Sequence, residues 1–199
     1  MKNKVLASCT SLLFSALLCA EVGAQKETAA PKDADKQTQA MMEAYQRVAT
    51  PGEPHKRMAD MAGSFDAATR MWMQPGATPT EGKGKSENKL IWEGRFLQQE
   101  YKGEMMGKPF TGMGMTGYDN AKKKYVGSWA DSMGTGLMYS EGAMDAAGKV
   151  LTMTTDLVDP MTGKKTRQRS VTRVESADRH VFEMYERDKS GKEWKSLEI

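Results

Sequence analysis

The chain has 199 residues, enough for one domain with a sizeable core, and 39% of its residues are hydrophobic. Its 29 basic and 26 acidic side chains nearly cancel. A balance this close to neutral gives no support for nucleic-acid binding or for attraction to an anionic membrane surface.

Residues 1–24 have the pattern of a secretory signal peptide. Lys2 and Lys4 form a short positive region, residues 5–20 are uncharged and rich in leucine, and residues 22–24 supply a small-residue cleavage site. The apolar run is too short and too poorly flanked for a stable transmembrane helix. We therefore expect export and cleavage, with a periplasmic location in a Gram-negative host and secretion in others.

Both cysteines, Cys9 and Cys19, lie inside this segment. The processed chain is therefore expected to have neither a disulfide nor thiol chemistry. A lipid anchor on Cys19 is disfavoured, because a bulky leucine stands where lipoprotein processing requires a small residue.

Two segments precede the main domain. Residues 25–37 are rich in Ala, Lys, Asp and Thr and are predicted to be a disordered linker. Residues 38–62 are predicted to form short helices, the second of which Pro54 can open. The first has apolar residues at helical spacing, namely Met41, Ala44, Tyr45 and Val48.

After Gly63 the hydrophobic period changes from 3.6 to 2, which predicts strands. We place them near residues 64–73, 83–92, 95–102, 110–118, 124–131, 136–144, 149–158, 166–176, 179–187 and 192–198. The short connections between them favour antiparallel neighbours, and closure of the sheet removes two long unpaired edges. Residues 63–199 are therefore predicted to form a mostly β fold, an antiparallel up-and-down β-barrel of about ten strands, with residues 38–62 as a helical plug or lid.

Alternation along the strands predicts which side chains face the barrel interior. In the eighth strand, Gln168, Ser170, Thr172 and Val174 share a face opposite three arginines. An interior that mixes hydroxyls with thioethers and aromatic rings suits a cavity better than a dry core, because every buried hydroxyl needs a partner. The candidate cavity-lining residues are Met71, Met113, Met115, Trp129, Met153, His180 and Met184.

Residues 112–117 match the G-x-G-x-x-G pattern of dinucleotide-binding proteins. That site requires a strand followed by a helix, whereas here a strand leads into the turn at Asp119. We expect these glycines to relieve crowding or to bend the strand. No G-x-S-x-G segment or cysteine nucleophile is present in the processed chain, so no enzymatic activity is predicted.

His180 and the methionines leave two alternatives open. His180 is one of only two histidines and could be an axial haem ligand inside a barrel. The chain has 17 methionines, and Met113 and Met115, roughly 7 Å apart on a strand face, could hold Cu(I). Core packing explains most of these residues equally well, and no resident cofactor is expected.

Several longer segments are similar to a bacterial family called domain of unknown function 1579. They are residues 71–76, 94–136, 159–164 and 180–185, and the resemblance extends over residues 55–199. The resemblance implies a lipocalin-like, or calycin, β-barrel and supplies no catalytic residues. Gly63, Ser64 and Phe65 occupy the place of the lipocalin G-x-W motif, with phenylalanine replacing tryptophan.

Three functions are compatible with these observations. The preferred one is a non-enzymatic barrel that holds a small, largely apolar ligand in its lumen. The alternatives are a haem- or copper-binding barrel that uses His180 or paired methionines, and a structural or partner-binding barrel with a filled core. The expected partners are at most a small apolar ligand and no nucleic acid, and the sequence specifies no protein partner.

Overall fold

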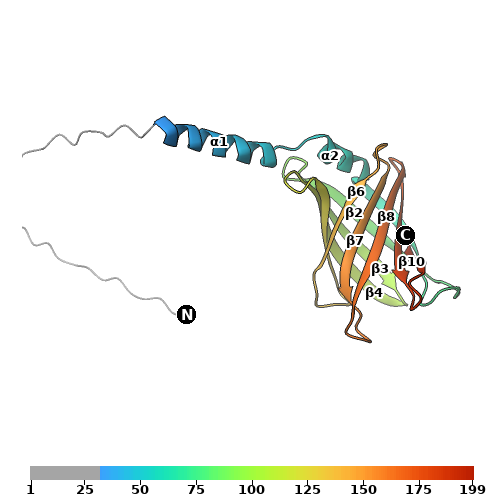
Figure 1. Cartoon of the computed structure of the whole chain (residues 1–199). Coiled ribbons are helices and arrows are strands. Elements are labelled where there is room, and N and C mark those ends of the chain that lie inside the picture. Colours follow the sequence, from blue (N-terminus) through green and yellow to red (C-terminus); the bar gives the residue numbers. More distant parts are fainter. Residues whose placement is uncertain (1–31) are drawn as a thin grey trace, which may run out of the picture. The chain divides into compact units, whose positions relative to one another are not determined.

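The computed structural model describes residues 32–199, so the predicted signal peptide and residues 25–31 of the predicted linker lie outside the described residues. By internal contacts the chain divides between Gln39 and Ala40, inside the first helix. Helices α1 (Lys32–Ala49) and α2 (Glu53–Lys56), labelled in Figure 1, come first in the described residues, and the 3-10 helix η1 (Arg57–Met61) follows.

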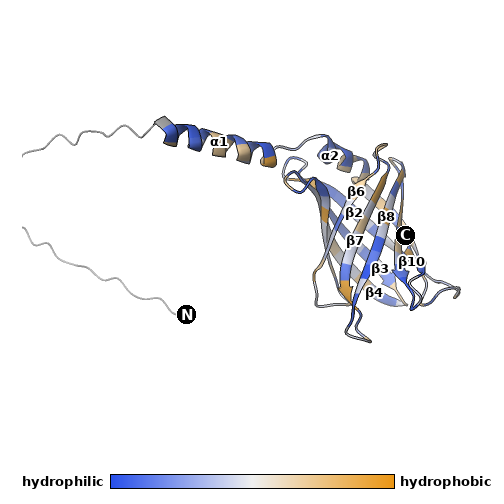
Figure 2. Cartoon of the chain, in the orientation of Figure 1, coloured by the Kyte–Doolittle hydropathy of each residue, from blue (hydrophilic) through white to orange (hydrophobic). Residues whose placement is uncertain are grey.

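The strands that follow close into an antiparallel up-and-down barrel, which confirms the predicted fold class. Each strand pairs with its neighbour in sequence, and β1 also pairs with β10. Figure 2 shows both hydrophilic and hydrophobic residues on the strands. Successive side chains of a strand point to opposite faces, one inward and one outward. In residues 32–199 the strands are β1 (Gly63–Met71), β2 (Thr80–Ile91), β3 (Phe96–Met105), β4 (Lys108–Asp119), β5 (Lys124–Asp131), β6 (Met138–Met144), β7 (Val150–Val158), β8 (Lys165–Ser176), β9 (Arg179–Arg187) and β10 (Glu193–Glu198).

Helix α1 differs from its prediction in two respects. It begins at Lys32, so residues 32–37 are helical where a disordered linker was predicted. Asp33 and Asp35 lie in its first turn, where carboxylates interact favourably with the helix dipole. Its predicted apolar face is exposed, at 51% for Met41 and 65% for Tyr45, so α1 is not part of the lid.

The lid is formed by α2 and η1 alone. Pro54 stands in the first turn of α2, where its missing N–H costs no hydrogen bond. The side chain of Met58 has no exposed surface, and that of Met61 is buried beside it. Both belong to the hydrophobic core cluster, which also contains Leu97, Tyr125, Leu151, Met153 and Val174.

Hydrogen bonds fasten the lid to the barrel wall. The Tyr125 hydroxyl donates to the carbonyl of Pro54 at 2.8 Å, and the Asn88 amide donates to the carbonyl of Met61 at 2.9 Å. These two donors come from β5 and β2. The lid therefore closes one end of the barrel through apolar packing and through hydrogen bonds to separate strands.

The barrel has a short seam between its first and last strands. β1 pairs with β10 only at Arg70 with Glu198 and at Met71 with Leu197. Residues 179–181 of β9 pair only with β8, because β10 and the following Ile199 meet β9 between Phe182 and Arg187. In the described part of the chain, residues 63–69 of β1 therefore have no strand partner on this side.

A charged network covers part of the outer wall. Glu183 is buried and accepts hydrogen bonds from Arg173 at 3.0 Å and from Lys195 at 2.7 Å. Burial alone would raise the pKa of Glu183, but the hydrogen bond from Lys195 and the charge of Arg173 outweigh it, and this pKa lies below its ordinary value of 4.5. The carboxylate of Glu183 therefore stabilises the folded state.

Replacement of Glu183 by Gln is expected to lower the free energy of unfolding at neutral pH by about 1–3 kcal/mol. Because the folded-state pKa is depressed, the contribution of Glu183 is complete above about pH 4.5 and is lost as the pH falls through the folded-state value. Urea denaturation across this range should show the two stability curves converging in acid. Glu175→Gln, at an exposed pair with Arg179, is the control and should change stability by less than about 1 kcal/mol; curves that stay parallel in acid would contradict the role of Glu183.

Candidate functional site: the barrel lumen

The barrel encloses a cavity of about 920 Å³ that is lined by residues from every strand. Cavities of this size are typical of proteins that bind small molecules. It begins below the lid, where Met61, Leu97 and Leu151 border it, and extends to the opposite end at Met105 and Asp131. The interior of this barrel is therefore a chamber and not a fully packed core.

Where β1 lacks a strand partner in residues 32–199, residues of both β1 and β9 border the cavity. Neighbouring residues of opposite alternation border it there, Asp66 to Ala68 on β1 and Arg179 to Val181 on β9. The ring of Phe65 lies against that of His180 across this gap, with centroids 4.6 Å apart.

The structure places most of the predicted lining residues around this cavity. Met71, Trp129, Met153, His180 and Met184 all border it. Met153 is buried near the lid, whereas Met71 lies at the far end of β1. These five residues therefore border the chamber, and their role in ligand binding stays a prediction.

Met113 does not line the cavity, and for this residue the prediction was wrong. Its side chain is 53% exposed and lies on the outer face of β4. Met115 borders the cavity, but alternation puts it on the same strand face as Met113, opposite Gln98 and Ser128 in the neighbouring strands. The face that turns inward is the one with Phe110 and Tyr118, because Phe110 is buried and Tyr118 packs against the core.

The glycines of the G-x-G-x-x-G segment make room for aromatic rings. A Cβ atom on Gly114 would lie 2.8 Å from the ring of Trp129, and one on Gly112 would collide with the same ring. On the outer face, a Cβ on Gly117 would lie 2.6 Å from Phe96. The expectation that these glycines relieve crowding is thus confirmed, and the Trp129 indole N–H, held against them, donates to Asp131 at 3.0 Å.

Aromatic residues that the sequence analysis did not select form much of one wall. Tyr101 and Phe110 are buried and border the cavity, and their ring centroids are 5.8 Å apart. Burial raises the pKa of the Tyr101 phenol, and within residues 32–199 its hydroxyl has no hydrogen-bond partner. The alternation of Leu97, Gln99 and Tyr101 in β3 was the available signal for this wall.

Two walls of the lumen carry polar side chains, and they differ in whether those side chains form hydrogen bonds with the protein. On β2 and β3, Gln99 donates to Ser86 at 3.0 Å, Ser86 donates to Asn88 at 2.8 Å, and Asn88 donates to the lid. On β7 and β8 the inward polar side chains border the cavity without a protein partner in residues 32–199. These side chains are Thr155, Gln168, Ser170 and Thr172.

His180 is engaged with the lid. Its Nε2 atom lies 2.9 Å from the carbonyl oxygen of Asp60 in η1, and since a carbonyl only accepts, Nε2 carries the proton. Use of Nε2 as an iron ligand would break this bond, so the geometry does not favour the haem alternative. Residues 32–199 contain no group of three or more His, Cys, Asp or Glu side chains that could hold a metal ion.

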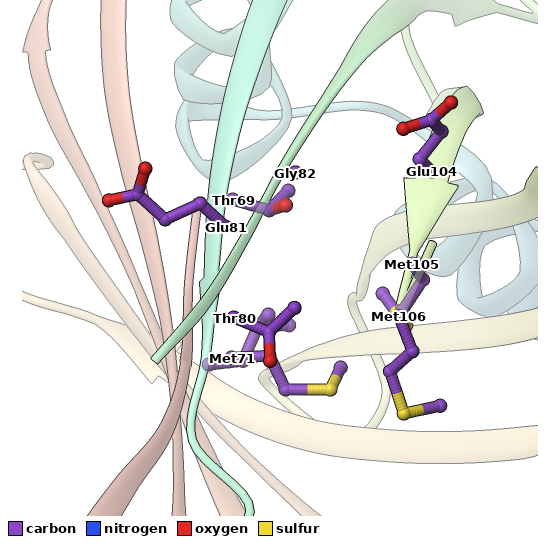
Figure 3. Close-up of a pocket in the computed structure, with 9 residues that line it drawn as sticks. Thr69, Met71, Thr80, Glu81, Gly82, Glu104, Met105 and Met106 are labelled. Carbon is purple, nitrogen blue, oxygen red and sulfur yellow. The ribbon is translucent and has the colours of Figure 1, made fainter. Parts of the chain in front are cut away.

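A second, much smaller pocket lies where β1 and β2 meet the turn between β3 and β4 (Figure 3). Its volume is about 10 Å³, and Met71, Thr80, Met105 and Met106 are among its lining residues. This is room for about one water molecule. The main cavity is therefore the candidate binding site.

The fold and the cavity together define the class of protein. A closed antiparallel barrel that has helices over one end and a chamber inside is consistent with the lipocalin-like barrels. The chain belongs to the family described as Protein of unknown function (DUF1579), whose model matches residues 50–199. A separate comparison with curated proteins found no match. Within residues 32–199, the helices are too short or too polar to span a bilayer.

Proposed function

We propose that the protein is an exported, non-enzymatic carrier or sensor that binds a small, largely apolar ligand in the barrel lumen. The observation that carries the proposal is the open cavity of about 920 Å³. A purely structural barrel of this size would fill its interior with side chains, because empty volume forfeits packing energy. Export is proposed from the signal-peptide pattern of residues 1–24.

The lining supports an apolar ligand. Rings and thioethers from several strands face the same chamber, including Phe65, Tyr101, Trp129 and Met184. Thioether side chains adapt their shape to a bound molecule, and aromatic rings supply large apolar area. Burial of a ligand against this surface is the main expected source of affinity.

The lining also explains why the proposal includes no catalysis. Asp131, a carboxylate at the margin of the cavity, accepts hydrogen bonds from the Trp129 indole and from the backbone N–H of Met133. His180, which also borders the cavity, donates to the carbonyl of Asp60. Both groups are held by structural partners and not aimed at one reacting atom.

Thr155→Trp is expected to weaken the binding of an apolar fluorescent probe by at least about tenfold, because the new side chain occupies the cavity that Thr155 borders. Its effect on stability should be small, below about 1 kcal/mol, since the ring enters open space. Probe titration and urea denaturation of parent and variant measure the two quantities.

Thr154→Trp is the matched control, because Thr154 is the preceding residue of β7 and is exposed on the outer face. It should leave probe binding unchanged. If the parent binds no probe and Thr155→Trp costs roughly 1–3 kcal/mol, the interior is overpacked by the substitution. That result would contradict the ligand-binding proposal in favour of a filled structural barrel.

A further inference from the structure

We propose that the lumen selects ligands with an uncharged hydrogen-bonding group, such as an amide, ester or alcohol, attached to an apolar body, and that Gln168 is the residue that recognises this group. The inference rests on the proposed function, since it concerns the same cavity. It goes further by assigning the polar contact and by excluding fatty-acid anions as preferred ligands.

The first argument is the state of Gln168. Its side chain is 9% exposed, and within the described residues its amide forms no hydrogen bond with the protein. A primary amide has two donors and one acceptor oxygen, and a buried amide without partners is unfavourable. Gln168 borders the cavity, so a ligand or water inside it can supply the missing partners.

The second argument is the contrast with the opposite polar wall. Gln99 is also an inward-facing glutamine, but it donates to Ser86 at 3.0 Å, and Ser86 is bonded onward to Asn88. That wall satisfies its own hydrogen bonds and holds the lid. Thr155 lies opposite Gln168 on β7, and Ser170 lies beyond Gln168 on the same face of β8. Their hydroxyls likewise form no hydrogen bond with another side chain in residues 32–199.

The third argument is the charge around the cavity. Carboxylates predominate among its charged lining residues, which are Asp66, Asp131, Asp178, Glu186 and Glu198 against Arg70 and Arg179. Both arginines are already paired, Arg70 with Glu198 at 3.3 Å and Arg179 with Glu175 at 2.5 Å. Among the lining residues within 32–199, no cation is free to neutralise a ligand carboxylate, so an anionic head group would be buried unpaired.

These arguments point to a neutral head group on β7 and β8 and an apolar body against the aromatic side of the lumen. The ligand's carbonyl or hydroxyl oxygen accepts from the Gln168 amide. A ligand N–H or O–H donates to the amide oxygen or to the hydroxyl of Ser170. We call the inward polar side chains of β7 and β8 the polar strip; they are Thr155, Gln168, Ser170 and Thr172. This polar strip determines which end of an amphipathic ligand lies inside and how the ligand is oriented.

The experiment is competition against an apolar fluorescent probe by a fatty amide, a fatty acid and a fatty amine of equal chain length. We expect the parent to bind the amide at least about tenfold more tightly than the carboxylate. In Gln168→Leu the amide-to-carboxylate ratio should fall to less than about threefold, while affinity for the probe itself is retained. Leucine replaces an unsatisfied amide with an apolar group, so this variant should fold at least as stably as the parent.

Gln98→Leu is the matched control, because Gln98 is on the outer face of β3 and donates to Glu100 at 3.2 Å. It should keep the head-group preference of the parent. Thr172→Val provides a second variant of the strip with conserved shape, and it should also reduce the preference for the amide.

The outcomes separate this inference from the proposed function. If the parent binds no probe at all, the proposed function fails and the inference fails with it. If the parent binds the probe but shows equal affinity for amide and carboxylate, or prefers the amine, only the inference is overturned. An unchanged ratio in Gln168→Leu would likewise remove Gln168 from the recognition site.

Discussion

Met58→Ala is expected to lower the free energy of unfolding by roughly 2–5 kcal/mol, a large loss for one truncation. Met58 has no exposed surface and belongs to the cluster that joins the lid to the barrel wall. Its truncation removes apolar contacts and leaves a space that the surrounding strands cannot collapse to fill. Urea denaturation followed by far-UV circular dichroism measures the loss.

Met41→Ala is the control for this change, because Met41 is a methionine in a helix with 51% of its surface exposed. It should alter stability by less than about 0.5 kcal/mol. Similar losses in the two variants would show that α1 buries its apolar face in solution. No loss in Met58→Ala would show that the lid does not pack on the barrel as the structure describes.

Gly142→Ala is expected to cost about 3 kcal/mol, at the upper end for overpacking. A Cβ atom on Gly142 would collide with the carbonyl oxygen of Thr152 and lie 2.7 Å from the Cα of Met153. These are backbone atoms of β7, so no side-chain rotation relieves the contact. The methyl group can be accommodated only if β6 and β7 separate, which breaks hydrogen bonds of the barrel.

Gly136→Ala tests whether the loss comes from this contact or from glycine replacement in general. Gly136 lies in the loop between β5 and β6, and a Cβ there would meet nothing within 4 Å. That variant should be within about 0.5 kcal/mol of the parent or slightly more stable, since alanine restricts the unfolded chain. Thermal unfolding of the pair is sufficient, and equal midpoints would contradict the predicted collision.

The strands could be predicted because their two faces differ consistently. In β8, arginines alternate with Gln168, Ser170 and Thr172, and the structure places these three around the cavity. Turn residues such as those at Asp119 and Gly148 mark the connections, so nearly every strand was located to within a few residues. Short connections predict antiparallel pairing, and closure of the sheet removes its unpaired edges.

The faces of β4 could not be predicted in the same way. Hydrophobicity favours Met113 and Met115 as the inward pair, since glycine carries no apolar signal. The structure turns Gly112 and Gly114 inward because Trp129 from β5 lies over them. That contact joins different strands, and a pattern read along one strand does not contain it.

The unsatisfied state of Gln168 was equally beyond sequence reasoning. Gln99 and Gln168 are both glutamines on inward strand faces, and their local patterns are alike. They differ because Ser86, on the neighbouring strand β2, accepts a hydrogen bond from Gln99, whereas no side chain within residues 32–199 forms a hydrogen bond with the Gln168 amide. Hydrogen-bond satisfaction depends on register between strands, which sequence periodicity leaves open.

The short seam between β1 and β10 has a consequence for the order of folding. Adjacent strands are local in sequence and form hairpins early, but Arg70 and Glu198 are separated by 128 residues, so their pairing requires closure of nearly the whole domain. We expect this step to be last and rate-limiting. Until it occurs, the domain is a curved sheet with two open edges, the form of the chain most exposed to aggregation. The contacts of His180 with Phe65 and Asp60 then stabilise the closed barrel.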